Sequence, residues 1–536
     1  MKQNTGLYII LTLTSAVLLS LPWLVPGCGL LALLGFVPLL CAERVASLSG
    51  TRHFWLWHYG TFVLWNALTT FWVCNATVGG GIFAVLANAL QMSLIFGIFR
   101  FSKRKLKGVL PYIFLMVMWI AWERFYFSAQ ISWPWLVLGN SFAASTWCIQ
   151  WYEITGSLGG SLWIWATNLT VFGIMVALSD GSWNRWNRKA RAALSVWAVS
   201  VFVFPAAASL VIGAKYEQRS EGVVDVLVGQ PNFDPYTKFE SMSQADQDES
   251  LLSLYRDGIE AGRQAPQLLL APETFTSNIL LNQLPEAPSL HRFHEFLRDY
   301  PRTDFLFGAS TYDIYDQRIR PDIMAVPIGN RWIKSHNSAI MTDASARTEV
   351  YHKSRLVVGT EMMPFPKILD PIDRALGYVI GRCVGQDEIS LLHLQDGTPF
   401  GCAICYESCY GEYCTGYVRK GAEFIAVITN DAWWGDTPGY KQHLRYSCLR
   451  AIELRRDIVR CGNTGISAFI DQKGRIVEKS QWWRPQTLRG NVNLNSERTV
   501  FVEYGDVVGR ICVLAFLLIL ALLFVRTVSG GFRRER

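Results

Sequence analysis

The chain has 536 residues, of which 51% are hydrophobic and 17% are charged, and its formal net charge is +7. Because soluble domains average about 25% charged residues, this composition excludes a chain that is soluble along its whole length. The basic residues are divided among several loops and carry no interleaved aromatic platform, which argues against a nucleic-acid-binding surface.

Long apolar segments fill the first part of the chain and return once near its end. A helix of about 20 apolar residues crosses the roughly 30 Å hydrocarbon core of a bilayer. We therefore predict eight membrane spans, seven before the globular part and one after it, at residues 7–25, 28–42, 54–74, 80–99, 109–127, 161–179, 192–213 and 509–525. The first span lacks a small-x-small cleavage site, so we interpret it as a retained helix and not as a signal peptide.

Among the terminal tails and the short loops between the predicted spans, lysine and arginine occur only in every second one. They occur at Lys2 and in residues 44–52, 100–107, 185–191 and 526–536. The other short loops contain neither residue; these are residues 26–27, 75–79 and 128–160. Since basic loops remain in the cytoplasm, both termini are expected there, and an odd number of spans places the globular part on the far side of the membrane.

Residues 214–508 have the composition of a globular protein, in which apolar strand-like segments alternate with amphipathic helical ones. The expected strands are 223–229, 267–274, 304–311, 400–405 and 424–431, and a hairpin is expected at 466–479. The expected helices are 244–263, 290–300, 411–420 and 440–456. This alternation predicts a layered α/β domain. The predicted domains are therefore 1–213 (membrane helices), 214–508 (α/β domain) and 509–536 (a last membrane helix with a basic tail).

Three expected strand ends carry reactive side chains, and loops at strand ends are where α/β domains gather their functional groups. Glu273 follows the apolar run 268–272, Lys353 lies on an expected strand eight residues before Glu361, and Cys405 ends a strand. Together they predict a catalytic site for acyl chemistry. A carboxylate takes the thiol proton, the thiolate attacks a carbonyl carbon, and an ammonium group stabilises the oxyanion.

The cysteines around the expected nucleophile suggest two alternatives. Cys402, Cys405, Cys409 and Cys414 lack the two close-spaced couples of a structural zinc site. Disulfides are plausible in an oxidising compartment, but the globular part has an odd number of cysteines, so at least one thiol stays free; these are residues 383, 402, 405, 409, 414, 448 and 461. We expect Cys405 to be unpaired.

Two further hypotheses depend on other residues. A Cys–His hydrolase would use His352 or His443, but His352 and Lys353 should face opposite ways on a strand, and His443 is expected on a helix surface or behind the site. A transporter would use charges within the membrane, and Glu123 with Arg124 near the end of the fifth span is the available pair. We interpret that pair as structural.

The motifs containing the three reactive residues carry a family resemblance. "PET" at 272–274, "HKSRL" at 352–356 and "CYE" at 405–407 resemble the carbon–nitrogen hydrolase (nitrilase) superfamily. The expected spans, together with "NDAWWGD" at 430–436 and "GNTGISAFID" at 462–471, are similar to those of the bacterial apolipoprotein N-acyltransferase family. The resemblance covers nearly the whole chain and implies a nitrilase-like αββα sandwich outside the cytoplasm.

The resemblance also implies roles for individual residues. Glu273 would be the base, Cys405 the acylated nucleophile and Lys353 a donor to the oxyanion. The supporting and substrate-binding residues would be Glu361, Tyr406, Glu407, Trp433 and Phe239. Two positions depart from the family pattern: Thr360 separates Gly359 from Glu361, and Phe239 stands where a tryptophan is expected.

The implied reaction moves a fatty acyl chain from a membrane phospholipid to the N-terminal α-amine of a diacylglyceryl-cysteine apolipoprotein, through a thioester and with ping-pong kinetics. The implied partners are the phospholipid, the apolipoprotein and the bilayer, with no metal, cofactor or nucleic acid, and the protein is expected to be a monomer in the bacterial inner membrane with its catalytic domain in the periplasm. The alternative is a membrane-bound amidase of the same superfamily, in which water and not an amine attacks the thioester.

Overall fold

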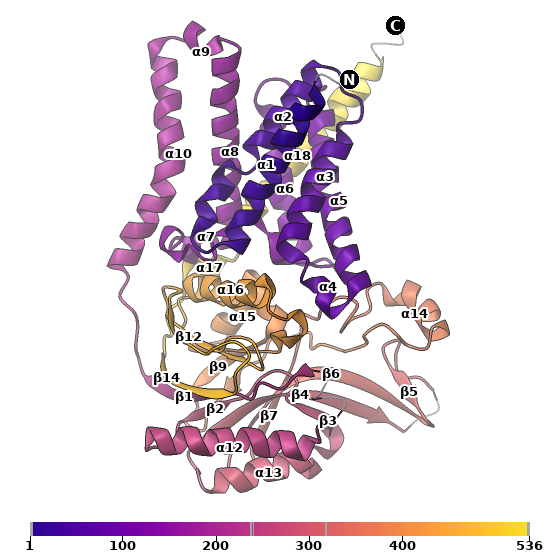
Figure 1. The fold of residues 1–536 in the computed structure, drawn as a ribbon, viewed down its shortest axis with the longest axis vertical. Helices are drawn as coiled ribbons and strands as arrows, with labels where there is room; N and C mark the ends of the chain where they lie inside the picture. Colours follow the sequence, from indigo (N-terminus) through magenta and orange to yellow (C-terminus); the bar gives the residue numbers. More distant parts are fainter. Residues whose placement is uncertain (1–3, 236–237, 239–240, 317–318, 533–536) are drawn as a thin grey trace. The chain divides into compact units, whose positions relative to one another are not determined.

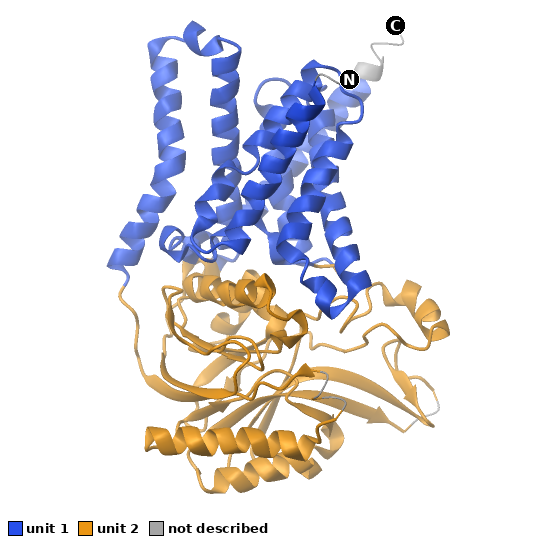
Figure 2. Ribbon diagram, in the orientation of Figure 1, with its two compact units in different colours: residues 1–129, 133–216, 504–536 blue, residues 130–132, 217–503 orange. Residues whose placement is uncertain are grey.

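The chain folds into two compact units in a computed structural model that describes residues 4–235, 238, 241–316 and 319–532 (Figure 2). Unit 1 comprises residues 1–129, 133–216 and 504–536, and unit 2 comprises residues 130–132 and 217–503. Unit 1 is helical, whereas unit 2 contains all the β-sheet of the described residues.

The helices of unit 1 follow the apolar segments of the sequence (Figure 1). The principal ones are α1 (Thr5–Leu24), α2 (Val37–Leu48), α3 (Trp55–Thr70), α5 (Val78–Ser102), α6 (Leu110–Tyr126), α8 (Ser157–Ser179), α10 (Arg188–Lys215) and α18 (Val507–Phe532). Shorter helices connect them: η2 (Cys28–Leu34), α4 (Val73–Ala76), α7 (Tyr152–Thr155) and α9 (Ser182–Arg185).

Six segments of the described residues are long and apolar enough to cross a membrane: Thr5–Leu24, Cys28–Leu48, Val78–Ser102, Ser157–Ser179, Arg188–Lys215 and Val507–Ser529. Two other predicted spans coincide with α3 and α6, which have 16 and 17 residues and fall just below the length that usually spans a bilayer. The total of eight spans therefore stays a prediction.

Both charged residues near the end of α6 have polar partners within unit 1. Arg124 Nη1 lies 2.7 Å from Asp506 Oδ2. The buried Glu123 Oε1 accepts hydrogen bonds from the Leu138 amide at 2.8 Å and from Trp119 Nε1 at 3.1 Å. These contacts tie α6 to neighbouring segments, as expected for structural charges, and they favour that interpretation over a transport pathway.

Unit 2 is built around two sheets. The first has eight strands in the order β14-β1-β2-β4-β6-β5, with β3 beside β4 and β7 beside β6. Its strands are β1 (Val223–Gln230), β2 (Leu268–Leu270), β3 (Thr276–Leu280), β4 (Asp304–Tyr315), β5 (Val326–Ile328), β6 (Arg331–Thr342), β7 (Thr348–His352) and β14 (Gln486–Asn493).

The second sheet has six strands in the order β13-β12-β11-β10-β9-β8. They are β8 (Leu392–His393), β9 (Pro399–Ile404), β10 (Phe424–Thr429), β11 (Ile458–Gly462), β12 (Ala468–Ile470) and β13 (Ile476–Lys479). The three central strands β9, β10 and β11 are parallel. Their carboxyl ends therefore meet at one edge, and the loops that follow β9 and β10 lie side by side.

Helices cover the outer face of each sheet, which gives four layers in the order helix, sheet, sheet, helix (Figure 1). Helices α12 (Gln244–Gly262) and α13 (Pro288–Arg298) pack on the eight-stranded sheet, and α15 (Gly411–Arg419) and α16 (Pro438–Leu454) pack on the six-stranded one. A short helix, α14 (Pro366–Ala375), lies in the connection between β7 and β8. The predicted α/β layered domain is confirmed.

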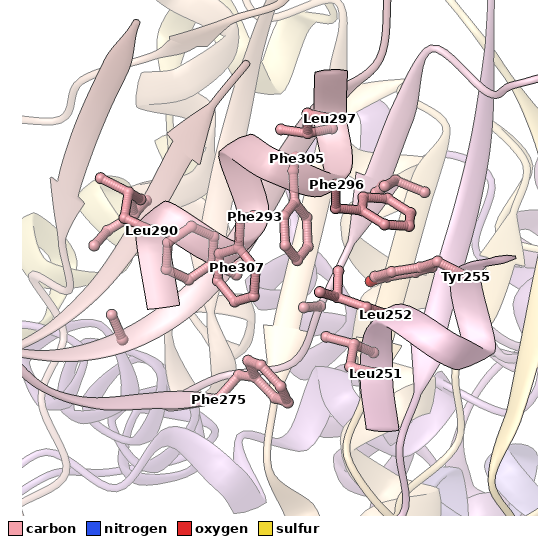
Figure 3. Packing of buried hydrophobic residues seen from close by; sticks show 14 of the residues in the cluster. Leu251, Leu252, Tyr255, Phe275, Leu290, Phe293, Phe296, Leu297, Phe305 and Phe307 are labelled. Atoms are coloured by element: carbon pink, nitrogen blue, oxygen red, sulfur yellow. The ribbon is translucent and has the colours of Figure 1, made fainter. Parts of the chain in front are cut away.

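The outer core of unit 2 shows why α12 forms where it does. Leu251, Tyr255 and Ile259 recur every four residues and are buried on one face of α12. Figure 3 shows Tyr255 beside Phe305 of β4, with the Phe293 ring of α13 on the other side of Phe305. Burying one such side chain contributes about 1.5–3 kcal/mol to stability. The buried face of α12 therefore holds this helix firmly against the eight-stranded sheet, from which two loops of the site emerge.

Several predicted bounds shift in ways that matter for the site. The strand predicted at 267–274 ends at Leu270, since Pro272 has no amide hydrogen to continue the ladder. Glu273 therefore lies on a loop beyond the strand. Lys353 likewise follows β7 directly instead of lying within it. The hairpin predicted at 466–479 is present as β12 and β13.

Candidate active site

Cys405 directly follows β9 and is the first residue of the short helix η7 (Cys405–Cys409), where the chain turns sharply. Its φ is +51°, a left-handed conformation that is uncommon for a residue with a Cβ and that costs about 1–3 kcal/mol. Hydrogen bonds hold the turn: Ser408 Oγ donates to the Cys405 carbonyl at 2.8 Å. The thiol residue is only 9% exposed, so its surroundings and not bulk water set its chemistry.

A buried ion-pair cluster lies on the loops after β2 and β7. Lys353 Nζ is 3.0 Å from Glu273 Oε1 and 2.8 Å from Glu361 Oε1. Asn337 Nδ2 donates to the same two carboxylate oxygens, at 2.8 Å each. The second oxygen of Glu273 accepts the Asn430 amide at 3.0 Å, and this amide follows β10 of the other sheet.

The close approach of β4 to the Glu273 loop requires a glycine. A Cβ at Gly308 would lie 2.5 Å from the Glu273 Cα and 2.5 Å from the Pro272 carbonyl oxygen. Real side chains do not reach such distances, so any other residue at 308 would push the loop away. The loop itself turns at Thr274, whose φ is +49°. The position of the carboxylate is thus fixed by backbone packing.

Electrostatic coupling links this cluster to the thiol. Burial lowers the pKa of Lys353, but the carboxylates of Glu273 and Glu361 outweigh burial and hold that pKa well above its ordinary value. Burial and then the Glu273 carboxylate raise the pKa of the Cys405 thiol well above its ordinary value, and Lys353 opposes this rise. The resting site therefore holds a neutral thiol beside a permanently charged ammonium group.

Glu407 connects the turn at Cys405 to the loop that carries Lys353. Its Oε2 accepts the Ile404 amide at 2.8 Å, just before the cysteine. Its Oε1 accepts the Ser354 amide at 2.7 Å and the Tyr351 hydroxyl at 2.7 Å. Glu407 is fully buried, and burial raises the pKa of its carboxyl group. This residue spans the two sheets and sets the spacing between Cys405 and Lys353.

The remaining predicted residues lie around the turn. The Tyr406 hydroxyl donates to the Ser132 carbonyl at 3.0 Å, and Tyr410 makes a 2.8 Å hydrogen bond to the Ser132 hydroxyl. Trp433 lies in η8 (Asp431–Trp434), after β10, and is 37% exposed. Phe239 lies outside the described residues, so its substrate-binding role stays a prediction.

A polar network that the sequence did not reveal lies behind Cys405. His443 of α16 is fully buried. Of the two positions expected for it, the helix surface is therefore wrong, and the position behind the site agrees with the structure. Its Nε2 is 3.0 Å from the Cys405 carbonyl oxygen, to which it donates. Its Nδ1 is 2.9 Å from Asp431 Oδ1 and 3.0 Å from Arg460 Nη2, and Arg460 also donates to Asp431 Oδ2 at 2.6 Å.

This network resembles a metal site in spacing but not in charge. The ligand atoms of Cys405, Asp431 and His443 lie within 4.8 Å of one another. The Arg460 guanidinium group, however, already neutralises Asp431 and contacts His443. The positive charge of a metal ion would therefore meet a buried cation, and these residues fit a hydrogen-bonded support better than a metal centre.

His352 points away from the cluster, as strand alternation predicts. Its ring stacks on His336 at a centroid distance of 4.4 Å, and its Nδ1 is 2.7 Å from Ser338 Oγ. Burial, aided by His336, lowers the pKa of His352 to about 4. The imidazole is neutral at physiological pH and has no contact with the Lys353 ion pairs.

The cysteine cluster contains free thiols. Cys402, Cys409 and Cys414 are buried and unpaired, and all twelve cysteines of the chain are free. Cys402 lies on β9 inside the sheet, three residues before the nucleophile turn. The expectation of a free Cys405 thus agrees with the structure, and its cysteine neighbours are packed side chains.

Sequence reasoning also missed Lys238, which is buried beside the Glu273 loop. Its ammonium group donates to the Thr274 carbonyl. Burial lowers the pKa of Lys238 to about 7, against the opposing effect of Glu273. A single lysine outside any apolar periodic pattern gives no signal in the sequence, whereas Asn430 belongs to the motif at 430–436 and could be found by motif analysis. Asn337 in the middle of β6 gave no signal.

Comparison with known proteins matches both parts of the chain. The model of the carbon-nitrogen hydrolase family matches residues 240–500, and the model of the apolipoprotein N-acyltransferase N-terminal domain matches residues 15–170. Among curated proteins, the apolipoprotein N-acyltransferase of Chlorobaculum tepidum is 27% identical, covering 90% of this chain and 89% of the relative. The apolipoprotein N-acyltransferase of Geobacter metallireducens is 26% identical, covering 96% of this chain and 95% of the relative.

Among solved structures, an amidase from Nesterenkonia sp. matches with a TM-score of 0.34 and 15% identity, covering 53% of this chain and 94% of the amidase. The two family matches follow one another along the chain in the order of its two units, and the curated relatives extend over nearly its whole length. This chain therefore belongs to the apolipoprotein N-acyltransferase family within the carbon–nitrogen hydrolase (nitrilase) superfamily.

Proposed function

We propose that this protein acylates the N-terminal α-amine of diacylglyceryl-cysteine apolipoproteins, with a membrane phospholipid as donor and Cys405 as the residue that carries the acyl chain. Its relatives are named for N-acylation of apolipoproteins. The observation that carries the mechanism is the buried Glu273–Lys353 pair, at 3.0 Å, whose charges both act on the Cys405 thiol.

The first half-reaction forms a thioester. Glu273 takes the proton of the Cys405 thiol as the sulfur attacks the ester carbonyl carbon, and the negative charge moves onto the carbonyl oxygen. Lys353, held charged by two carboxylates, stabilises that oxyanion. The carbon–oxygen bond then breaks, and the departing lysophospholipid oxygen receives the proton from Glu273.

The second half-reaction transfers the acyl chain to the acceptor. An α-amine with a pKa near 8 is partly neutral at physiological pH and can attack the thioester carbon. Glu273 takes the amine proton, the carbon–sulfur bond breaks, and the sulfur recovers a proton because a buried thiol of raised pKa favours the neutral form. The lysophospholipid leaves before the acceptor amine reacts at the same site, and this order gives ping-pong kinetics.

We further propose that unit 2 lies outside the cytoplasm. The partition of lysine and arginine supports this orientation. The beginning of α1, the short helix α9 and the end of α18 all lie at one end of unit 1, which is consistent with their common placement by that partition (Figure 1). In a bacterium this arrangement corresponds to the inner membrane with the site in the periplasm, and we propose a monomer.

Mass spectrometry of the purified protein with phospholipid alone tests the proposal. The expected result is a fatty-acyl adduct on Cys405 that hydroxylamine removes and that an apolipoprotein peptide amine discharges. Cys405→Ser serves as the matched variant and should form no hydroxylamine-sensitive adduct. A Cys405→Ala protein that still acylates the peptide would overturn the proposal. Release of free fatty acid in place of acylated peptide would favour the amidase-like hydrolase.

A further inference from the structure

Unit 1 contains a groove with a volume of about 930 Å³, at the end where α2 is joined to α3. Its walls come from the end of α2, the beginning of α3 and the second half of α5. Every lining residue belongs to unit 1. The groove is therefore separate from the Cys405 site, which lies in unit 2.

The groove has an excess of positive charge at one end. Arg52, Arg100, Lys103 and Arg104 line it. Glu43 compensates two of them, with Arg100 Nε at 3.4 Å and Lys103 Nζ at 2.5 Å. Within the part of the chain that the structure describes, Arg52 and Arg104 form no ion pair, and both are exposed. Two cationic side chains are thus available to an anion.

The rest of the groove is apolar and follows α5. Leu90, Leu94, Ile98 and Phe101 lie three or four residues apart, so they share one face of the helix, and each is at least 42% exposed. At about 1.5 Å per residue, Leu90 to Phe101 extends over about 16 Å. This strip leads from the cationic end toward the middle of the helix.

Gly97 leaves the strip hollow. It lines the groove between Leu94 and Ile98 of the strip, and a Cβ built on it would meet no atom within 4 Å. A larger side chain would therefore occupy the groove without straining the helix. His58 and Ser93 also line the groove, are buried, and form a 2.8 Å hydrogen bond with each other. A ligand therefore need not supply a hydrogen-bond partner for this pair.

We propose that this groove binds an anionic phospholipid, with the phosphate between Arg52 and Arg104 and one acyl chain along the apolar strip of α5. Basic pockets between membrane helices are suited to anionic headgroups, and the adjoining apolar strip suits a chain that is covalently joined to that headgroup. A free phosphate would use only the cationic end. This lipid is bound and not consumed, so it differs from the acyl donor of the proposed reaction.

The test measures lipid binding to the full-length protein by native mass spectrometry in detergent. Phosphatidylglycerol, phosphatidylethanolamine and glycerol phosphate are titrated separately. Phosphatidylglycerol is expected to bind most tightly, and Arg52→Gln with Arg104→Gln should weaken it about thirtyfold. Arg188→Gln with Lys189→Gln, the same charge change at the beginning of α10, is the matched control and should leave the affinity unchanged.

A second pair of variants tests the path of the chain. Gly97→Leu fills the groove and should weaken phosphatidylglycerol binding about tenfold, whereas Gly60→Leu, at an exposed position of α3 that also has open space, should not. Unchanged thermal unfolding midpoints verify that both variants fold. Equal losses of affinity in the Arg52/Arg104 and Arg188/Lys189 double variants, no effect of Gly97→Leu, or glycerol phosphate binding as tightly as the lipid would each overturn the proposal. Cys405 acylation is read separately, so failure here does not affect the proposed function.

Discussion

Cys405 is held as a neutral thiol by the same carboxylate that is expected to deprotonate it. In many cysteine enzymes nearby positive charge lowers the thiol pKa and creates a resting thiolate. Here burial and then Glu273 raise the pKa of the thiol, and Lys353 and a hydrogen bond with Thr429 do not offset the rise. With unit 2 outside the cytoplasm, as proposed, a resting thiolate would react with oxidants there, so a thiol that ionises only during attack on a bound ester suits the proposed compartment.

The first prediction concerns this thiol and Glu273. Because the folded-state pKa of Cys405 is raised above 9.0, the rate of its alkylation by iodoacetamide should still be rising with pH at 9.0. Glu273→Gln removes a negative charge that raises the pKa. At a pH below that pKa, alkylation should therefore become faster, about tenfold for each unit by which the pKa falls. The same variant loses the base, and its phospholipid-dependent acylation should fall about 100- to 10,000-fold.

The measurement is peptide mass spectrometry of Cys405 after timed alkylation, with the acyl adduct quantified in parallel. Glu388→Gln, on an exposed loop of unit 2, is the control and should change neither rate. Slower alkylation in Glu273→Gln would contradict the electrostatic account, and unchanged acylation would contradict the base role.

The second prediction concerns Glu407, whose two oxygens accept from both sheets. Glu407→Gln keeps the size but turns one acceptor into a donor that faces a backbone amide. An unsatisfied buried group costs about 1–3 kcal/mol, so the unfolding free energy should fall by that amount and Cys405 acylation should fall with it. Denaturant unfolding and adduct yield provide the two readouts. Full acylation in a destabilised variant would show that Glu407 only stabilises the fold.

At the scale of elements, α16 supports the nucleophile turn through one side chain. His443 donates to the Cys405 carbonyl at 3.0 Å, and Asp431 with Arg460 fixes the imidazole ring from behind. The positive φ of Cys405 would relax if this contact were lost. His443 is therefore a positioning residue that acts through the backbone of the turn.

The third prediction compares the buried His443 with the half-buried His352. His443→Ala should reduce Cys405 acylation up to about 100-fold, since a displacement near 1 Å at a reacting centre can cost that much. His352→Ala removes a half-buried ring that faces Ser338 and should leave acylation largely intact. The rate of adduct formation, measured at saturating phospholipid, distinguishes a slower chemical step from weaker binding. Abolished acylation in His352→Ala would favour a Cys–His mechanism instead.

The elements themselves were largely predictable, because apolar length and periodicity are local properties. The helix α12 was found from Leu251, Tyr255 and Ile259, and the end of β9 was found from its apolar run. The site was predictable only as a set of strand ends. That Asn337 bridges Glu273 and Glu361 depends on β6 lying between β4 and β7, and such pairing over long sequence distances leaves no local signal. The expectation that Glu273, Lys353 and Cys405 act together therefore came from the family resemblance of their motifs and not from periodicity.

At the scale of the whole molecule, the proposed orientation makes the fourth prediction. Val477, 70% exposed on β13, should be accessible from outside the cytoplasm, and Lys107, in the loop after α5, should not. In cells whose outer membrane is permeable, Val477→Cys should react with a membrane-impermeant maleimide, whereas Lys107→Cys should react only after the inner membrane is opened.

The four partly exposed native cysteines are first replaced by serine to remove background labelling; they are Cys28, Cys41, Cys74 and Cys383. Labelling of Lys107→Cys in intact cells, with Val477→Cys protected, would reverse the proposed orientation. Labelling of both would show that the inner membrane had leaked.

The bonds between the two sheets have a consequence for how the protein matures. The Glu273 carboxylate reaches the Asn430 amide, and Glu407 reaches Ser354, each joining a loop of one sheet to a loop of the other. A nascent chain in which only one sheet has formed lacks these links, so its sulfur would not meet its proton acceptor. If the protein takes its acyl donor from the bilayer as proposed, it would thereby leave the lipids of its own membrane uncleaved until assembly is complete.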